Sequence, residues 1–326
     1  MTKIFITGGA GYVGAVLTPY LISKGFKVTV FDLMIYGDNL LKKDSNLKIV
    51  KGDIRDTELL NKALAGHDIL IHLACISNDP SFELNPKLGK SINLDAFVPL
   101  VETAKKNSIK RFIYASTSSV YGIKKEKDVN ESMSLEPLSD YSKYKAECEA
   151  ILIKYMSENF TPVIIRPATV CGYSPRQRLD VVVNILTNLA YHKRVITIFG
   201  GEQLRPNIHI NDMARAYEIL IKAPKSKVSG EIFNAGYENR TVSDLANVVK
   251  GVLGDDIQLI STPTDDNRSY HISSKKIKKI LNFNSEFTIE NAVNDLKTAF
   301  RKGLLPNSLT DEKYFNIKRM QSIKLR

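Results

Sequence analysis

The sequence predicts an α/β protein with a doubly wound parallel sheet and a smaller C-terminal lobe. Short apolar runs alternate with helix-like segments over the first half of the chain, as in a parallel sheet whose strands are joined by crossover helices. A glycine-rich turn follows the first apolar run and opens a helix. Beyond Pro167 the alternation stops, and the segments become shorter, more polar and irregular. These three observations carry the prediction.

The first half of the chain supplies the sheet and the helices that cover it. The apolar runs predict strands at residues 3–6, 27–31, 47–50, 68–73, 111–115 and 161–165. The intervening patterns predict helices at residues 15–24, 57–65, 87–107 and 140–159. Ser139 and Asp140 are residue types that cap a helix N-terminus, which supports the start of the last helix.

The second half of the chain predicts a lobe built onto that sheet. Its helices are expected at residues 181–192, 211–222, 243–252 and 289–303, and its loops at 172–180, 200–207, 223–230 and 261–270. We therefore divide the chain into residues 1–166 and 167–326, with an interleaved boundary. The loops of the second part are free to hold a ligand.

Length and composition indicate an ordinary globular protein. The chain has 326 residues, with 43% hydrophobic and 25% charged residues. No apolar run approaches the roughly 18 residues that cross a membrane, and the glycine turn at residue 8 leaves no room for a cleaved signal peptide. The three cysteines, Cys75, Cys148 and Cys171, are too far apart for a zinc motif or a disulfide framework. We expect a cytoplasmic protein without a metal or a membrane partner.

The net charge of +11 raises the question of nucleic-acid binding. The lysines are scattered, however, and their densest cluster, at residues 275–279, falls on a short helix-like segment. We interpret that cluster as a solvated face and expect no nucleic-acid partner. A moderate positive field also suits an anionic small substrate.

The glycine turn, T-G-G-A-G-Y-V-G at residues 7–14, indicates a dinucleotide site. Gly8 permits a tight turn, Gly11 lets a diphosphate approach the helix N-terminus, and Gly14 lets helix and strand pack closely. Asp32 ends the second apolar run, where its carboxylate can accept hydrogen bonds from a ribose diol. Strand, turn, helix and acid together predict NAD as the cofactor.

A tyrosine, a lysine and a row of hydroxyls form a candidate catalytic group. Tyr141 and Lys145 are four residues apart at the start of a predicted helix and therefore share a face. A nearby ammonium favours the phenolate form, so we expect Lys145 to make Tyr141 a usable base. The fifth predicted strand ends in A-S-T-S-S-V-Y-G (residues 115–122), at the strand end where ligands bind in such folds.

These motifs together resemble the extended short-chain dehydrogenase/reductase family of nucleotide-sugar epimerases and dehydratases. The resemblance rests on the G-x-x-G-x-x-G spacing, on S-T-S-S-V-Y-G and on Y-S-K-Y-K, and it extends over almost the whole chain. It implies a Rossmann-type fold, with an NAD-binding domain at residues 1–166 and a nucleotide-sugar-binding lobe at residues 167–326.

The resemblance also implies roles for individual residues. Catalytic roles fall on Thr117, Tyr141 and Lys145. Cofactor contacts fall on Gly8, Gly11, Tyr12, Val13, Gly14, Asp32, Asp53, Ile54, Leu73, Ala74, Asn93, Tyr141, Lys145 and Ala168. Substrate contacts fall on Ser118, Ser119, Thr169, Arg178, Arg205 and Arg268.

Two departures narrow the expected chemistry. Dehydratases of the family place Asp-Glu after the catalytic threonine, whereas this chain has Ser118 and Ser119, whose hydroxyls cannot replace a carboxylate pair in an elimination. Residues 174–180, S-P-R-Q-R-L-D, look like those of enzymes for bacterial surface-polysaccharide sugars, including C4 dehydrogenases of nucleotide-linked heptoses. Their arginines suit a diphosphate or sugar hydroxyls. A solvent-exposed basic loop is the alternative.

We therefore expect NAD-dependent redox chemistry on a nucleotide-diphosphate sugar, at C4. The sequence leaves open whether the protein is an epimerase, a dehydrogenase that releases its keto product, or a 4-keto reductase. A non-catalytic NAD sensor is a further alternative, against which the retained Tyr141 and Lys145 argue. We interpret His209 and His271 as structural. In the family the helices at 87–107 and 140–159 pair across a two-fold axis, which implies a homodimer.

Overall fold

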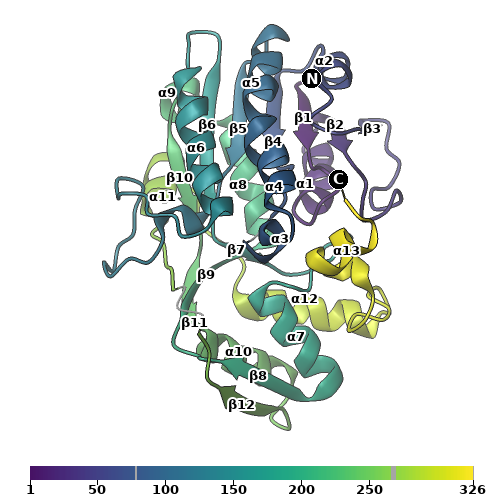
Figure 1. Cartoon of the computed structure of the whole chain (residues 1–326), viewed down its shortest axis with the longest axis vertical. Coiled ribbons are helices and arrows are strands. Elements are labelled where there is room, and N and C mark those ends of the chain that lie inside the picture. Colours follow the sequence, from purple (N-terminus) through teal and green to yellow (C-terminus); the bar gives the residue numbers. More distant parts are fainter. Residues whose placement is uncertain (78, 266–268, 326) are drawn as a thin grey trace.

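A seven-stranded parallel sheet lies at the centre of the larger part of the molecule (Figure 1). The computed structural model describes residues 1–77, 79–265 and 269–325. The strand order is β10-β6-β5-β4-β1-β2-β3. The strands are β1 (Lys3–Thr7), β2 (Lys27–Asp32), β3 (Leu47–Lys51), β4 (Ile69–His72), β5 (Arg111–Ala115), β6 (Thr161–Pro167) and β10 (Ile232–Ala235). The predicted α/β class with a parallel Rossmann-type sheet is confirmed.

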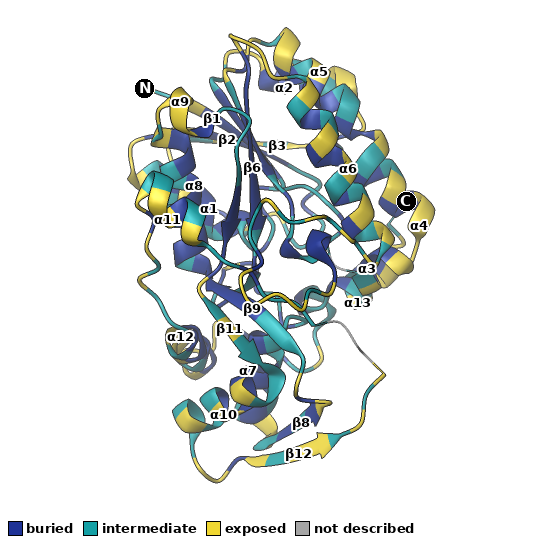
Figure 2. Ribbon diagram, turned by 90° about the vertical axis from the view of Figure 1, so that its left-hand side faces the viewer, coloured by how far each residue is buried: buried dark blue, intermediate teal, exposed yellow. Residues whose placement is uncertain are grey.

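Helices cover both faces of the sheet, and the strands between them are buried (Figure 2). One face packs against α1 (Gly14–Ser23) and α8 (Ile210–Lys222), and the other against α2 (Thr57–Leu64), α5 (Phe97–Lys106) and α6 (Asp140–Lys154). Side chains alternate along β1. Ile4 and Ile6 pack in the core on the side of α1 and α8, whereas Phe5 packs in the core on the side of α2, α5 and α6. Strands buried on both faces explain the nearly continuous apolar runs in the sequence.

The helix predicted at residues 87–107 is interrupted. It consists of α4 (Pro86–Lys90), a π-helical segment η1 (Ser91–Asp95) and α5. Within η1, the carbonyl of Asn93 accepts a hydrogen bond from the Cys148 thiol, at 3.2 Å. The helix predicted to run to residue 159 ends at Lys154, and its start is a capping box between Ser139 and Ser142.

The smaller lobe contains strands that the sequence did not reveal. A three-stranded sheet has the order β11-β9-β7, and β8 pairs with β12. The bounds of these strands are β7 (Thr169–Cys171), β8 (Val195–Phe199), β9 (Leu204–His209), β11 (Glu238–Thr241) and β12 (Gln258–Thr262). The loops predicted at 200–207 and 261–270 are therefore wrong at residues 204–207 and 261–262, which lie in β9 and β12. Strands β7, β9, β11 and β12 are short and carry few apolar residues in regular alternation. Strand β8 (VITIF) is apolar, with Ile196 and Ile198 buried, and its pattern does indicate a strand.

Helices complete this lobe and the connections to it. They are α3 (Asp79–Glu83), η2 (Ser118–Tyr121), α7 (Val182–Lys193), α9 (Lys225–Val228), α10 (Val242–Leu253), α11 (Lys275–Leu281), α12 (Ile289–Arg301), η3 (Glu312–Tyr314) and α13 (Asn316–Ser322). The loop predicted at 223–230 thus contains α9. None of the helices in the described residues combines the length and the apolarity that a membrane span requires.

The two halves of the chain interleave. Strand β10 lies in the second half of the sequence, yet it pairs with β6 in the main sheet, with Ile232 opposite Ile164. Helix α8 likewise packs on α1. The second half therefore contributes to the Rossmann-type layer as well as to the lobe. The assignment of cofactor binding to residues 1–166 and of substrate binding to residues 167–326 stays a prediction.

Candidate active site

A cavity of about 520 Å³ lies at the carboxyl ends of the main-sheet strands and extends to the smaller lobe. This is the position at which parallel α/β sheets bind ligands. Most of the residues predicted from the sequence line it together: Gly8, Gly11, Tyr12, Val13, Gly14, Asp32, Asp53, Ile54, Leu73, Ala74, Thr117, Ser118, Ser119, Tyr141, Lys145, Ala168, Thr169, Arg178 and Arg205.

The glycine turn forms one wall of this cavity. A Cβ atom on Gly8, whose φ is +75°, would lie 2.6 Å from the backbone nitrogen of Ala74, so no side chain fits there. A Cβ on Gly14 would lie 2.6 Å from the carbonyl oxygen of Gly8. A Cβ on Gly11 would approach only the carbonyl oxygen of Gly8, at 3.2 Å, so the space beside Gly11 is otherwise open. The turn thus brings bare backbone to the N-terminus of α1, as a dinucleotide diphosphate requires.

Asp32 is placed to accept a ribose diol. Its Oδ1 accepts a hydrogen bond from the Met34 amide at 2.8 Å, and its Oδ2 accepts one from the Ala10 amide at 2.9 Å. Each carboxylate oxygen keeps a second lone pair. Burial raises the pKa of Asp32, while the two backbone hydrogen bonds oppose that rise. The residues of the turn and of strand β2 therefore fit NAD.

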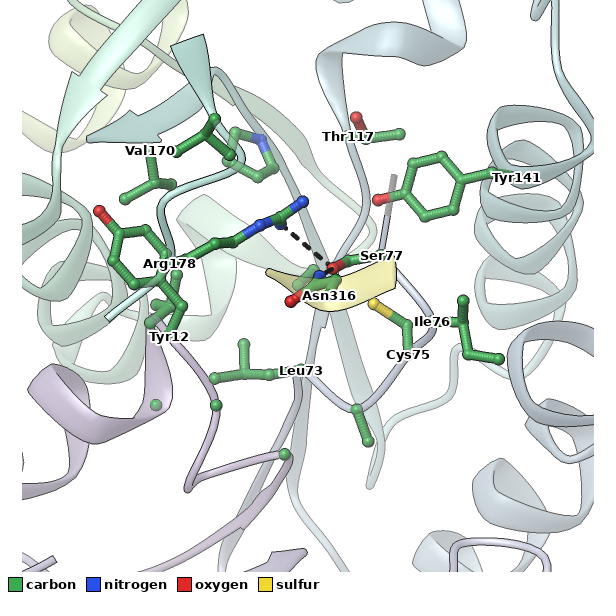
Figure 3. A pocket seen from close by; sticks show the side chains of 18 of the residues that line it. Tyr12, Leu73, Cys75, Ile76, Ser77, Thr117, Tyr141, Val170, Arg178 and Asn316 are labelled. Atoms are coloured by element: carbon green, nitrogen blue, oxygen red, sulfur yellow. Dashed lines mark hydrogen bonds between the residues drawn. The ribbon is translucent and has the colours of Figure 1, made fainter. Parts of the chain in front are cut away.

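The three predicted catalytic residues converge at the other end of the cavity. Thr117 follows β5, and Tyr141 and Lys145 lie on the first turns of α6. Figure 3 shows the Thr117 and Tyr141 side chains close together. The Thr117 Oγ1 lies 3.0 Å from the Ser119 hydroxyl, and Thr117 acts to lower the pKa of Tyr141.

The charge environment of Tyr141 differs from the expectation. The Lys145 ammonium donates to the Ala115 carbonyl at 2.7 Å and lies 6.0 Å from the centroid of the Tyr141 ring. Burial raises the pKa of Tyr141, and Arg178 and Thr117 oppose this rise. Desolvation is the largest of these influences, so the pKa of Tyr141 rises where pairing with Lys145 was expected to lower it.

Two of the predicted residues, Asn93 and Asp53, contribute differently from the others. The Asn93 side chain is absent from the cavity lining, and it instead holds the backbone of Ile76 through two hydrogen bonds of 2.9 Å. Asp53 lines the cavity, but its carboxylate is held by the Arg55 guanidinium, with the shortest contact at 2.6 Å. Arg268 lies outside the described residues.

Residues 174–180, here called the arginine loop, dock onto the glycine turn. The Ser174 hydroxyl donates to the Tyr12 carbonyl at 2.8 Å, and the Tyr12 hydroxyl donates to the Gly172 carbonyl at 2.7 Å. The loop thereby carries Arg176 and Arg178 into the cavity wall. Only 3% of the Arg176 surface is exposed. The alternative of a solvent-exposed basic loop is wrong.

The structure adds cavity residues that the sequence did not indicate. Tyr36 comes from the loop after β2, Ser77 from the loop after β4, and Asn316 and Met320 from α13. Helix α13 joins the site from the far end of the chain. No motif marks it, because its contribution depends on tertiary docking alone.

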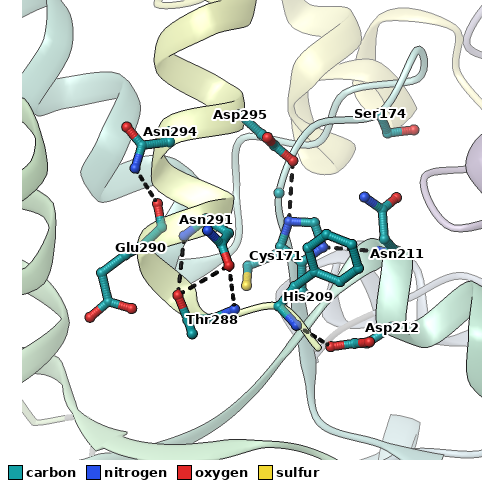
Figure 4. A network of polar contacts seen from close by, with 12 residues as sticks. Cys171, Ser174, His209, Asn211, Asp212, Thr288, Glu290, Asn291, Asn294 and Asp295 are labelled. Carbon is teal, nitrogen blue, oxygen red and sulfur yellow. Dashed lines mark hydrogen bonds and ion pairs between the residues drawn. The ribbon is translucent and has the colours of Figure 1, made fainter. Parts of the chain in front are cut away.

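His209 is held in a structural network outside the cavity lining (Figure 4). Its Nδ1 accepts from the Asn211 amide at 3.1 Å and thus caps α8, and its Nε2 lies 3.2 Å from the Asp295 carboxylate. The ring stacks on Phe287, with centroids 4.8 Å apart. The structural interpretation of His209 fits this arrangement. The described residues contain no group of three or more His, Cys, Asp or Glu side chains placed to hold a metal ion.

Comparisons with known proteins agree with this site. The NAD-dependent epimerase/dehydratase family model matches residues 4–236. The chain is 34% identical over 256 residues to the dTDP-D-glucose 4,6-dehydratase of Dictyostelium discoideum, a match that covers 72% of this chain and 58% of that protein. It is 32% identical over 267 residues to an uncharacterized UDP-glucose epimerase of Bacillus subtilis, YtcB, with coverage of 77% and 82%.

A solved structure shows the same architecture. The UDP-glucose 4-epimerase of Thermotoga maritima, determined with UDP-glucose, is 26% identical and aligns with a TM-score of 0.83. The alignment covers 93% of this chain and 100% of that one. The family model, which includes both the glycine turn and the Tyr141 segment, implies NAD, and the cavity fits it. The protein is an enzyme with NAD as its cofactor, and the chain belongs to the NAD-dependent epimerase/dehydratase family.

Proposed function

We propose that the protein is an epimerase that oxidises the C4 hydroxyl of a nucleoside-diphosphate sugar and reduces the keto sugar again on its opposite face. The observation that carries the proposal is the meeting of Thr117 and Tyr141 at one end of a cavity whose other end is the glycine turn. The relatives support the substrate class, since one is named as a dTDP-D-glucose 4,6-dehydratase and another as a UDP-glucose epimerase.

Each catalytic residue has a definite task in this proposal. Tyr141, once ionised, accepts the proton of the C4 hydroxyl; burial opposes this ionisation, while Arg178 and Thr117 favour it. Thr117 donates a hydrogen bond to the substrate oxygen as it becomes a carbonyl. Lys145, anchored on the Ala115 carbonyl, holds the nicotinamide ribose and adds positive charge near the phenol. NAD, when bound, would accept the hydride from C4 of the sugar.

The substrate diphosphate would bind Arg205. This residue lies on β9, in the smaller lobe, and its guanidinium carbon is 5.3 Å from the centroid of the Tyr270 ring. A planar guanidinium can hold a diphosphate through two parallel hydrogen bonds. Ser118, Ser119 and Thr169 line the same cavity and would hold sugar hydroxyls.

A 4,6-dehydratase activity is not favoured by this site, although some relatives bear that name. Ser118 and Ser119 occupy the two positions after Thr117, and both line the cavity. The Asp180 carboxylate, which also lines it, is paired with Arg178 at 2.6 Å. Elimination of water needs an acid and a base of suitable pKa, and serine hydroxyls supply neither near neutral pH.

Product analysis would test the proposal. The protein is incubated with UDP-, GDP-, dTDP- and CDP-linked sugars, and the products are identified by NMR. An epimerase inverts C4 without net formation of NADH. Stoichiometric NADH with a 4-keto product would indicate a dehydrogenase, and conversion of a 4-keto sugar only would indicate a reductase. A role in surface-polysaccharide synthesis would be supported by activity on sugars of such polymers. Binding of NAD without any conversion would favour the NAD-sensor alternative.

The carboxylate of Asp32 should make the protein prefer NAD over NADP. We expect NAD to bind at least about tenfold more tightly than NADP, because the carboxylate repels a 2′-phosphate and accepts from a free 2′-hydroxyl. Asp32→Asn should narrow this ratio, since it removes the charge but keeps an oxygen for the Ala10 or Met34 amide. Calorimetric titration of both dinucleotides measures the ratio. Tighter binding of NADP by the unmodified protein would contradict the assignment.

We also propose that the protein is a homodimer. Helices α5 and α6 lie on the same face of the sheet, and half-buried apolar residues such as Leu94 and Ile151 lie on or beside them. Pairing of these helices with their copies would bury this surface in a self-complementary interface. Light scattering at micromolar concentration should give twice the chain mass of 36.5 kDa. A mass of one chain at every concentration would exclude the dimer.

A further inference from the structure

Two buried guanidinium groups in the cavity wall have donors without partners. Arg176 gives one N–H to the Asn316 side-chain oxygen, with 2.5 Å between Nη2 and Oδ1. Its Nε and Nη1 have no hydrogen-bond partner among the described residues, and neither has Nη2 of Arg178. Buried polar groups are almost always hydrogen-bonded, so three such atoms in one cavity wall indicate a missing acceptor.

The charges lead to the same conclusion. Arg178 has a carboxylate partner, Asp180, with 2.6 Å between Nε and Oδ1. The described residues form no salt bridge with Arg176, whose guanidinium instead stacks on Tyr36 with its carbon 3.4 Å from the ring centroid. Burial lowers the pKa of Arg176, and the charge of the nearby Asp180 carboxylate only partly opposes this effect. An anionic ligand in the cavity would stabilise the charged guanidinium further.

The unpaired N–H groups of Arg176 and Arg178 line the same cavity as the glycine turn, where the diphosphate of NAD is expected to bind. Ser174 anchors the arginine loop on the carbonyl of Tyr12, within the glycine turn. Figure 3 shows Arg178 extending across the cavity from the side of Tyr12 toward Ser77. Burial raises the pKa of Asp32, and the positive charge of Arg176 opposes this rise, so Arg176 acts at the ribose end of the cavity. The N-terminus of α1 adds its partial positive charge.

We propose that Arg176 and Arg178 bind the diphosphate of NAD, which would lie between the arginine loop and the glycine turn. Guanidinium forks suit this ligand, because they give two parallel hydrogen bonds to phosphate oxygens. The proposal reassigns Arg178, which the sequence placed with the substrate. It rests on NAD as the cofactor and is independent of the sugar chemistry proposed above.

Asn316 is the positioning residue of this arrangement. Its Oδ1 accepts from Arg176 and from the Tyr36 hydroxyl, at 2.5 and 3.0 Å, and its Nδ2 donates to the Ser77 hydroxyl at 3.0 Å. The same Ser77 hydroxyl accepts from Arg178 at 3.2 Å. Helix α13 thus holds both arginines and the loops after β2 and β4 in one network.

Binding of NAD and of adenosine to an Arg176→Gln variant tests the proposal. Charge-assisted hydrogen bonds are strong, so we expect the Kd for NAD to rise about 10- to 100-fold. Adenosine, which lacks phosphates, should bind the variant as it binds the unmodified protein. Calorimetry on protein freed of nucleotide measures both ligands. Arg194→Gln, which breaks an exposed ion pair in the smaller lobe, is the matched control and should leave both unchanged.

A second titration distinguishes the two sources of diphosphate. UDP, GDP, dTDP and CDP represent the substrate side, where Arg205→Gln should weaken binding while NAD affinity is kept. Loss of nucleoside-diphosphate affinity in Arg176→Gln, with NAD affinity kept, would overturn the proposal. Equal losses for NAD and adenosine would also overturn it, because they would mean a distorted cavity. If none of the four nucleoside diphosphates binds, the proposed activity on sugar nucleotides is contradicted. The NAD titration still tests whether Arg176 and Arg178 bind the diphosphate of NAD.

If Arg176→Gln does not fold, the conservative variant Arg176→Lys provides a second test of the proposal. Arg176→Lys keeps the positive charge but replaces the fork by a single ammonium. We expect it to lose NAD affinity by a smaller factor than the glutamine variant, and to keep its affinity for adenosine. Unchanged NAD affinity in a folded Arg176→Lys or Arg176→Gln protein would overturn the proposal.

Discussion

Replacement of Tyr141 by Phe is expected to lower turnover by at least about 100-fold, the scale of a lost general base, while NAD remains bound. The change removes only the hydroxyl that takes the proton. The ring keeps its place against the apolar core around α6. Turnover is measured by NMR on the sugar nucleotide that the unmodified protein converts, and NAD binding is measured by calorimetry.

The same helix offers a matched control. Tyr144 lies one turn along α6, and its ring packs against Phe82 with centroids 5.6 Å apart, outside the cavity lining. Tyr144→Phe also removes one phenol, yet it should leave turnover unchanged. Near-normal turnover in Tyr141→Phe with NAD bound would mean that the chemistry lies elsewhere.

Substitutions of the other two proposed catalytic residues should affect turnover and NAD binding in distinct ways. Thr117→Ala should lose less activity than Tyr141→Phe, because water or a backbone group can replace one hydrogen-bond donor. Lys145→Ala should weaken both NAD affinity and turnover, since Lys145 has two tasks. Combined substitutions should cost far less than the product of the single losses, because the three residues act as a unit.

Local patterns explain why most of the cavity could be predicted from the sequence. The glycine turn, Asp32 and the pair Tyr141–Lys145 each depend on residues close in sequence, and each is attached to a strand or helix with a clear periodicity. Parallel strands bring their carboxyl ends to one edge, so the predicted residues had to meet there.

The remaining parts of the site depend on contacts between distant segments. Ser77 and Asn316 are 239 residues apart in sequence and share a hydrogen bond of 3.0 Å. The sign of the Tyr141 pKa shift also follows from tertiary burial, which the local spacing of Tyr141 and Lys145 does not reveal. Strand β10 joins the sheet only because β6 offers it a free edge, and its four residues carry no pattern of their own.

A buried polar network lies beneath the catalytic end of the cavity and joins β5, α6, β6 and β10. Glu149 on α6 accepts from Arg166 on β6, at 2.6 Å between Nη2 and Oε2 and 3.0 Å between Nε and Oε1, and it also accepts from the Ser116 hydroxyl. Arg166 donates in turn to the Tyr121 hydroxyl at 2.7 Å, and Tyr121 donates to Asn234 on β10 at 2.8 Å. Ser116 immediately precedes Thr117, so this network helps to fix the position of the proposed catalytic threonine.

Glu149→Gln is expected to lower the free energy of unfolding by about 3–5 kcal/mol, the usual cost of breaking a buried ion pair from one side. The Arg166 and Glu149 side chains are only 3% and 4% exposed, so water cannot replace the lost carboxylate. In the native protein Glu149 raises the pKa of Arg166 against the lowering effect of burial, and the variant loses this support. Arg166 nevertheless stays charged in the variant's core, because a guanidinium keeps its proton near neutral pH. Urea unfolding at neutral pH measures the change.

The exposed neighbour Glu147 provides the control for this prediction. Glu147→Gln removes the same charge from the same helix and should change the free energy of unfolding by less than about 0.5 kcal/mol. A loss below about 1 kcal/mol in Glu149→Gln would show that Arg166 finds another acceptor, and the network would then not be what holds α6 to the sheet. If the predicted loss is found, turnover should fall as well, because Ser116 loses a charged acceptor one residue before Thr117.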